Sequence, residues 1–484
     1  MLSIGKLGVA GGADYYLDKV ANSVDDYYLG RGEAPGQWVG QAATALGLTG
    51  QVDPEELRNL LAGKAAGGEA LGLQVQPGRR PGYDLTFSAP KGVSLLWAFG
   101  AADVRDAISA AHDLAVASVI DQLSTEACFA RRGHGGAELV EANGFIGAAF
   151  RHRTSRAGDP QLHTHVVVPN LVQAADGRWS APDGRHLFAW KMTAGALYRS
   201  AMRAQLAPLG LAWDIRRNGL SELANVPKTI LRAFSKRRVD IEAAMDARGT
   251  ASQRAAETAA LDTRQGKPAG GSQVDVLREG WLEQLVAIDL PDGAGGTRPA
   301  GVDDLTAALG REASTAPDPA AVEEVFRALA GEQGVSLDDW EIDEQHLADS
   351  GAPGARVLPV TLLGSSFSRR DAISAVARAF DVTPVEAVAL TARFLDRDGV
   401  VRILADRDLD PAREDVGAGT EQIRTRSGHV VPATSGDRRY TTTELLAAEE
   451  RIVASATGRV GAGCAQVGSV TVDDVLARHG HLDG

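Results

Sequence analysis

The sequence predicts an α+β fold, in which a mostly antiparallel sheet is flanked by helices and followed by a mainly helical C-terminal region. Three observations lead to this class. Residues 83–88 and 162–168 alternate in polarity or are rich in β-prone side chains, which is typical of strands. Residues 104–127 repeat apolar side chains at helical spacing. After residue 275, the remaining pattern is mainly that of amphipathic helices.

The elements of the first half follow in order along the chain. The strand over 83–88 comes first, and the helix over 104–127 follows it. The apolar-rich stretch 144–150 is expected to be the next strand, ahead of the strand over 162–168. Turn signals occur at 181–184. Strands interrupted by long helices favour antiparallel pairing, with the helices packed on the sheet.

The second half is expected to hold short helices. Residues 320–330 and 371–380 are amphipathic candidates, and Thr441 with Glu444 forms a capping-box pattern ahead of another helix. At about 150 residues per domain, the length of the chain suggests roughly three domains. We expect them to be a first domain over 1–275, an acidic helical linker region over 276–355 and a small mainly helical region over 356–484.

Charge is distributed unevenly along the chain. The 484 residues carry 50 Lys and Arg against 63 Asp and Glu, a net charge of −13. Residues 281–350 alone hold 16 acidic and 3 basic residues, whereas residues 151–240 hold 15 basic and 6 acidic ones. The first of these segments accounts for the whole net charge. The acidic total therefore does not exclude a nucleic-acid partner for the basic segment.

Composition excludes several other classes of protein. Two cysteines cannot form a disulfide framework or a cysteine-rich zinc site. The N-terminal residues have no continuous apolar segment of the secretory type, and no run approaches the 18 or so apolar residues of a membrane span. We therefore expect a cytoplasmic protein without membrane insertion.

Three histidines are candidates for a metal site. His163 and His165 are two residues apart on a predicted strand, so both imidazoles point to the same face. His152 lies 11 residues earlier, and a turn through 158–160 can bring it beside the pair. Three imidazoles with an open position suit a catalytic divalent metal, and imidazole favours Zn, Cu, Ni or Fe over Mg. The alternative is three unrelated surface or hydrogen-bonded histidines. Of the others, His112 and His134 are expected to be structural, and His186 to lie in a loop.

Four of the seven tyrosines form two doublets within fourteen residues, at Tyr15, Tyr16, Tyr27 and Tyr28. One interpretation is an aromatic stripe that anchors an N-terminal helix on the sheet. The other is nucleophilic catalysis. A phenol has a pKa near 10 and is a poor nucleophile at neutral pH unless a metal or a base assists it. A metal that polarises a phosphodiester would give such a tyrosine a function.

These features occur together in an order that resembles a known family. The tyrosine doublets are followed by YDLTFSAPK at 83–91, then by FRHRTSR at 150–156 and DPQLHTH at 159–165. This order resembles the conjugative relaxases of the MobF class, of the TrwC/TraI type, within the HUH endonuclease superfamily. The resemblance covers residues 1 to about 275. It implies a palm-like relaxase domain that nicks DNA and transfers the cut strand.

The resemblance also implies a role for each motif residue. The metal ligands would be His152, His163 and His165, holding a divalent ion such as Mg, Mn, Zn or Ni. Asp84 would orient one of these histidines or help to deprotonate the tyrosine. The nucleophile of the first nick would be Tyr15, and that of the closing transfer Tyr27. Their neighbours Tyr16 and Tyr28 would be accessory tyrosines. The product of the first step would be a 5′-phosphotyrosine and a free 3′-hydroxyl.

The implied partner is single-stranded DNA at a plasmid transfer origin, with accessory relaxosome proteins and a type IV secretion coupling protein. Trp179, Trp190 and Tyr198 could stack bases, or belong to the core. The basic residues are assigned to phosphate contacts only as a group, which comprises Lys91, Arg151, Arg153, Arg156, Lys236, Arg237 and Arg238.

Two alternative functions remain open at this point. A rolling-circle replication initiator of the same superfamily would use the same chemistry, and a non-catalytic DNA-binding module could retain the fold alone. Residues 440–446 resemble the lead-in to a relaxase-associated helicase. The Gly-x-x-x-x-Gly-Lys-Ser/Thr phosphate loop is absent from the 484 residues, so the sequence gives no basis for ATPase activity here.

Overall fold

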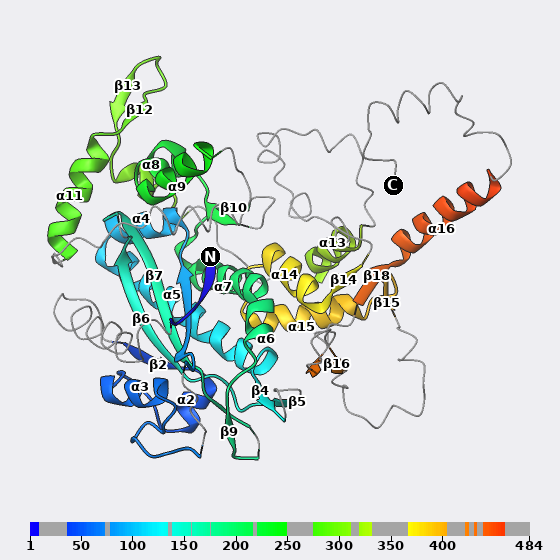
Figure 1. Cartoon of the computed structure of the whole chain (residues 1–484). Helices are drawn as coiled ribbons and strands as arrows, with labels where there is room; N and C mark the ends of the chain where they lie inside the picture. The colour runs from blue at the N-terminus through cyan, green and yellow to red at the C-terminus, as the bar shows by residue number, and fades with distance from the viewer. Residues whose placement is uncertain are drawn as a thin grey trace.

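A five-stranded antiparallel sheet, on the left in Figure 1, organises the first half of the chain in the computed structural model. Its strand order is β1-β3-β7-β6-β2, and every neighbouring pair is antiparallel. Helices cover the sheet, which confirms the predicted α+β class. The strands are β1 (Leu2–Lys6), β2 (Gln37–Val39), β3 (Gly82–Ser88), β6 (Gly147–Thr154) and β7 (Pro160–Pro169).

The structure describes residues 1–8, 36–72, 78–133, 138–155, 157–174, 176–215, 220–248, 274–310, 319–331, 366–403, 422–424, 430–432 and 439–459. No helix in these ranges is both long enough and apolar enough to span a bilayer.

Strand β6 begins three residues later than the sequence suggests and continues to Thr154. Gly144, at the start of the expected strand, has a φ of +114°. A residue with a side chain rarely adopts this conformation. The amide of the next residue, Phe145, donates to the hydroxyl of Ser124 at 3.0 Å rather than to a neighbouring strand. The chain therefore enters the sheet only after this contact.

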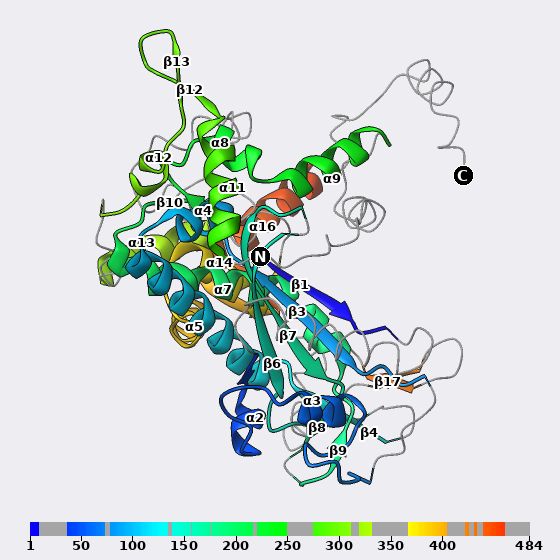
Figure 2. The same cartoon turned by 90° about the vertical axis from the view of Figure 1, so that its left-hand side faces the viewer.

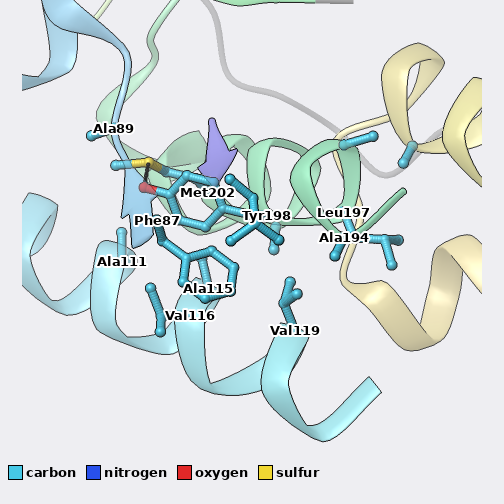
Figure 3. Close-up of a cluster of buried hydrophobic side chains, with 14 of the residues drawn as sticks. Phe87, Ala89, Ala111, Ala115, Val116, Val119, Ala194, Leu197, Tyr198 and Met202 are labelled. Carbon is cyan, nitrogen blue, oxygen red and sulfur yellow. Dashed lines mark hydrogen bonds between the residues drawn. The ribbon is translucent and has the colours of Figure 1, made fainter. Parts of the chain in front are cut away.

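The two faces of the sheet bury different sets of side chains. One face packs against α4 (Lys91–Phe99), α5 (Ala102–Glu126) and α7 (Lys191–Leu206), and we call this the large core. In Figure 3, Phe87 of β3 and Tyr198 of α7 meet above the alanines and valines of α5, with their ring centroids 5.4 Å apart. The helix predicted over 104–127 is α5, so that prediction is confirmed.

The opposite face of the sheet carries a small core. Trp38, Phe150 and Val167 pack there with α2 (Gln41–Ala45) and α3 (Pro54–Leu61), which lie below the sheet in Figure 1. Helix α3 begins with a proline, and the carboxylate of Asp53 accepts hydrogen bonds from two amides of its first turn at 2.7 and 3.1 Å.

Shorter elements connect and flank the sheet. His186 was expected in a loop, but this expectation is wrong because His186 lies in the short helix α6 (Gly184–Ala189). Asp183 caps that helix, and its second carboxylate oxygen lies 2.8 Å from Nδ1 of His186. The remaining elements of this part are β4 (Phe129–Arg132), β5 (Glu138–Glu141), β8 (Val172–Gln173), β9 (Trp179–Ser180), α6 (Gly184–Ala189), η3 (Ala207–Leu209), β10 (Trp213–Ile215), β11 (Ser221–Leu223), α8 (Lys228–Ala233) and α9 (Lys236–Asp246).

After residue 273 the chain is mainly helical, as predicted. A three-stranded sheet of order β14-β18-β15 accompanies the helices, and a hairpin of β12 and β13 lies within the region expected to be a helical linker. The elements are α11 (Val274–Val286), β12 (Asp289–Pro291), β13 (Thr297–Pro299), α12 (Asp303–Thr306), α13 (Pro319–Ala330), β14 (Phe367–Ser368), α14 (Arg369–Ala379), α15 (Pro384–Leu395), β15 (Val400–Ile403), β16 (Gln422–Arg424), β17 (Val430–Pro432), β18 (Arg439–Thr442) and α16 (Thr443–Gly458).

The helix starts in this part depend on their caps. Helices α14 and α15 each begin with a full capping box, from Ser368 and Thr383 respectively. The capping box expected at Thr441 is wrong by one residue. Helix α16 begins at Thr443, directly after β18 ends. Its cap is therefore Thr442, whose hydroxyl accepts from the Leu445 amide at 3.3 Å.

The large core continues across the expected domain boundary at residue 275. It includes Trp281 of α11 and Ile373 of α14 together with residues of the central sheet. Helix α7 lies between the sheet and α14. On its outer side, the hydroxyl of Ser200 donates to the Phe380 carbonyl at 2.7 Å, and its oxygen accepts from the Val382 amide at 3.0 Å. The described residues on both sides of the boundary therefore pack as neighbours, while the expected division into three domains remains a prediction.

Arg203 of α7 is expected to hold the C-terminal helices in place. Its side chain is 1% exposed, and it donates to the carbonyls of Ala377 and Phe380 at 2.9 Å each and to Asp381 at 2.5 Å. Substitution Arg203→Met should lower the free energy of unfolding by about 3 kcal/mol, because it removes the buried guanidinium and all three of these hydrogen bonds. Urea denaturation followed by tryptophan fluorescence measures this loss. The exposed Arg327→Met is the control, and equal midpoints for the two variants would contradict the assignment.

Candidate metal centre

Three histidines meet at the end of the sheet where β6 turns into β7. The strand register pairs His152 directly with His163, and His165 lies two residues further along β7 on the same face. The ring centroids are 5.0 to 5.2 Å apart in all three pairs. One ligand atom from each residue lies within 4.8 Å of the other two. The sequence-based expectation that the turn through 158–160 brings His152 beside the pair therefore agrees with the register.

Hydrogen bonds at Nδ1 fix two of the three imidazoles. Nδ1 of His163 lies 2.9 Å from the Gln161 carbonyl oxygen, which can only accept. Nδ1 of His165 lies 2.9 Å from both carboxylate oxygens of Asp84 on β3. A proton on each Nδ1 satisfies these contacts and leaves the lone pair of each Nε2 available. The carboxylate partner of His165 is the arrangement commonly found behind a metal-bound imidazole.

Thr86 is a residue of this site that the sequence reasoning missed. It lies opposite His165 in the β3–β7 register. Its hydroxyl is 3.3 Å from Oδ1 of Asp84 and 3.1 Å from Nδ1 of His165. The hydroxyl can therefore hold Asp84 in its rotamer against the imidazole. The sequence contained a signal for Thr86, because this residue follows Asp84 by two positions and a strand places such a pair on one face.

The chemistry of this donor set fits a divalent metal. Within the described ranges, these three histidines are the cluster of metal-type side chains close enough to share an ion. His152 is 4% exposed, whereas the other two are partly exposed and leave an approach from solvent. Three neutral imidazoles with an open position bind Zn, Ni, Cu or Fe more readily than Mg, which prefers oxygen ligands.

The tyrosines Tyr15, Tyr16, Tyr27 and Tyr28 lie outside the described residues. The structure does describe both ends of the segment that contains them. Leu7 follows β1 at one edge of the sheet, and Trp38 lies in β2 at the other edge. Both side chains belong to the small core, on the face of the sheet that carries the three histidines.

The turn between the two ligand strands is fastened by three neighbouring elements. The ammonium of Lys91, at the start of α4, donates to the Pro160 carbonyl at 2.8 Å. The amide of Lys236 at the start of α9 donates to the buried carboxylate of Asp159 at 2.9 Å, and its ammonium lies 3.2 Å from the same group. The indole of Trp281 in α11 donates to the Gly158 carbonyl at 2.8 Å.

The described basic residues predicted to contact DNA have different surroundings. Arg151 points to the face opposite the histidines, where it pairs with Asp113 of α5. Burial lowers the pKa of Lys91 to about 8, against the opposing effect of nearby carboxylates, and its ammonium is directed inward. Arg238 pairs with Glu242 along α9. Of the others, Arg153 and Arg237 are half-buried and Arg156 lies outside the described residues. DNA contacts of this group remain a prediction.

Two of the three aromatic residues considered for base stacking belong to the core. Trp190 is 5% exposed and Tyr198 is fully buried, so the stacking interpretation is wrong for both. Trp179 is partly buried and packs against the small core.

An antiparallel sheet that presents three histidines and an aspartate on one face, with long helices behind it, is the architecture of the histidine-metal DNA relaxases. A family model described as TrwC relaxase matches residues 9–288, and the chain belongs to this family. The match extends past residue 275 and includes α11.

Individual relatives agree with this assignment. The chain is 37% identical over 299 residues to the multifunctional conjugation protein TraI of Escherichia coli and 34% identical to its counterpart in strain K12. These alignments cover 59% of this chain and 16% of each TraI protein, so the chain spans a small part of the length of those relatives.

Solved structures of the relaxase TrwC in complex with oriT DNA have the same fold over the matched region. A metal-bound complex and a copper-bound complex share 30% and 31% identity with this chain, each with a TM-score of 0.50. Each covers 59% of this chain and 97% of the TrwC chain.

Proposed function

We propose that this chain is a metal-dependent, site-specific endonuclease and strand transferase that acts on single-stranded DNA at a plasmid transfer origin. It cuts one strand through a 5′-phosphotyrosine intermediate and rejoins the strand during conjugation. The observation that carries the proposal is the cluster of three imidazoles backed by Asp84, in a member of the TrwC relaxase family.

The residues of the cluster have distinct tasks in this proposal. His152, His163 and His165 would hold a divalent ion, which supplies Lewis acidity to the scissile phosphate when bound. Asp84 accepts a hydrogen bond from the protonated Nδ1 of His165 and keeps that imidazole in the tautomer that presents Nε2. Among the metals Mg, Mn, Zn and Ni, the three nitrogen donors favour Zn or Ni over Mg.

The tyrosines carry the covalent step. The phenol oxygen of Tyr15 attacks the phosphorus in line, and the bond between phosphorus and the 3′-oxygen breaks. The phenol gives up its proton, with the assistance of Asp84 or solvent, and the departing 3′-oxygen gains one. Tyr27 is assigned to the closing transfer, with Tyr16 and Tyr28 as accessory residues. Because one phosphoester replaces another, no nucleotide hydrolysis is needed.

Family membership favours conjugation over the two alternatives. A rolling-circle initiator would share the nicking chemistry, and a non-catalytic module would share the fold. Accessory relaxosome proteins and a type IV secretion coupling protein are the partners we propose besides transfer-origin DNA. The proposed location is the cytoplasm.

A covalent adduct assay tests the proposed function. The chain is incubated with a divalent metal and a fluorescent single-stranded oligonucleotide that carries the transfer origin of its own replicon. We expect a protein–DNA adduct on a denaturing gel, together with a shortened strand that ends in a 3′-hydroxyl. An oligonucleotide of scrambled sequence is the control. Failure to form the adduct with Mg, Mn, Zn and Ni alike would overturn the proposal.

A further inference from the structure

A series of buried, hydrogen-bonded side chains lies behind the metal centre, on the other face of β7. His112 of α5 is fully buried, and both of its ring nitrogens have partners. Nε2 lies 2.8 Å from the hydroxyl of Thr164, and Nδ1 lies 2.8 Å from the hydroxyl of Tyr198 on α7. Thr164, at 2% exposed, is the residue between His163 and His165. This series of hydrogen bonds thus reaches β7, the strand that carries two of the three histidines.

The directions of these hydrogen bonds follow from the donors available. The hydroxyl of Tyr198 donates to the sulfur of Met202 at 3.4 Å, a contact drawn in Figure 3. Tyr198 must then accept from Nδ1 of His112, so the proton of the imidazole is on Nδ1 and Nε2 accepts from Thr164. In this arrangement all three bonds form at once. Burial also lowers the pKa of His112 well below its ordinary value, so the neutral imidazole that this arrangement needs is the stable form.

Thr164 is well placed to control the direction of its neighbours. Successive residues of a strand point to opposite faces, so a fixed Thr164 on one face fixes the pleat from which His163 and His165 project on the other. The strands on both sides have bulky side chains opposite it, Phe87 on β3 and Arg151 on β6. The hydrogen bond from Thr164 to His112 ties the side chain of this residue to the helical layer.

We infer that His112, supported by Tyr198, is a positioning residue for the metal centre: it holds Thr164 from behind and so sets how β7 presents His163 and His165. This inference rests on the proposed metal site. His112 is not a catalytic residue, because it lies on the face of the sheet away from the histidines and acts only through Thr164.

Metal binding to the full chain tests the inference without any nicking reaction. The probes are Zn²⁺, titrated by calorimetry, and Co²⁺, whose visible absorption reports the geometry of its ligands. We expect Thr164→Val and His112→Asn to weaken Zn²⁺ binding by about threefold to tenfold, less than the loss of a residue that contacts a ligand directly. Both variants should also change the Co²⁺ spectrum. His112→Gln should stay close to the wild type, because its amide reaches the position of Nε2 and keeps the contact with Thr164.

Thr391→Val is the matched control for an effect on stability alone. Thr391 is as buried as Thr164, and its hydroxyl donates to the Ala387 carbonyl at 2.7 Å within α15. This variant should lower the melting temperature as Thr164→Val does, yet leave the Zn²⁺ affinity and the Co²⁺ spectrum unchanged. If His112→Asn fails to fold, the Zn²⁺ affinity and the Co²⁺ spectrum of Thr164→Val test the positioning role.

The outcomes separate this inference from the proposed function. Wild-type affinity and spectrum in Thr164→Val, whatever its melting temperature, would overturn the positioning role and leave the metal site intact. A wild-type chain that binds neither ion would overturn the metal site and the positioning role together.

Discussion

Substitution Tyr15→Phe is expected to abolish the covalent adduct with transfer-origin DNA. The change removes a single oxygen atom, which is the nucleophile of the proposed first step, and leaves the aromatic ring for packing. Loss of a nucleophile costs about a thousandfold or more in rate, so the adduct should fall below detection on a denaturing gel.

The second doublet and the neighbouring tyrosine provide the controls for this experiment. Tyr16→Phe should form the adduct as the wild type does. Tyr27→Phe should form it too, but should fail to transfer the bound strand to a second oligonucleotide. An undiminished adduct in Tyr15→Phe would show that another group attacks the phosphorus, and the tyrosine assignments would then have to be revised.

Substitution His163→Ala is expected to remove the bound metal and most of the nicking activity. Two imidazoles remain, which is one fewer than the three protein ligands of a typical catalytic site. The Lewis acidity of such an ion contributes several kcal/mol, which corresponds to about a thousandfold in rate. Metal content by mass spectrometry and adduct yield on a denaturing gel measure the two losses separately.

His186→Ala is the matched control, since His186 lies in α6 and pairs with Asp183 away from the cluster. It should keep both the metal and the adduct. Treatment of the wild type with a chelator should reproduce the loss seen in His163→Ala, and added metal should restore activity only in the wild type. Unchanged metal content in His163→Ala would refute the ligand assignment.

Three strands of the central sheet could be predicted from the sequence because their signals are local, whereas the edge strands β1 and β2 were not predicted. The alternation around residues 83–88 and 162–168 predicted two of the three inner strands, and the turn at 158–160 predicted the pairing of His152 with His163. Local caps were less certain. Thr441 and Thr442 are both suitable, and the point where β18 ends and α16 begins makes Thr442 the cap.

The side-chain pairs around the site and the burial of its aromatic residues could not be predicted, because they depend on contacts between residues far apart in the sequence. No local pattern reveals that Arg151 pairs with Asp113, or that His112 contacts Thr164 and Tyr198. The same limit applies to Trp190 and Tyr198, whose burial is decided by the helices that pack on them. The positions of the tyrosines relative to the cluster lie outside the described residues, so their roles still rest on the sequence and the family.

The hydrogen bonds that hold the turn at 158–160 affect the free energy of metal binding. Lys91, Lys236 and Trp281 restrain the hairpin that joins the two ligand strands, so the ligands lose little conformational freedom when an ion arrives. Such preorganisation raises affinity without any additional ligand. Trp281 belongs to α11, beyond the Gly/Ala/Pro-rich stretch at 267–272. The smallest piece of chain with a fully restrained ligand hairpin therefore ends after α11, not before it.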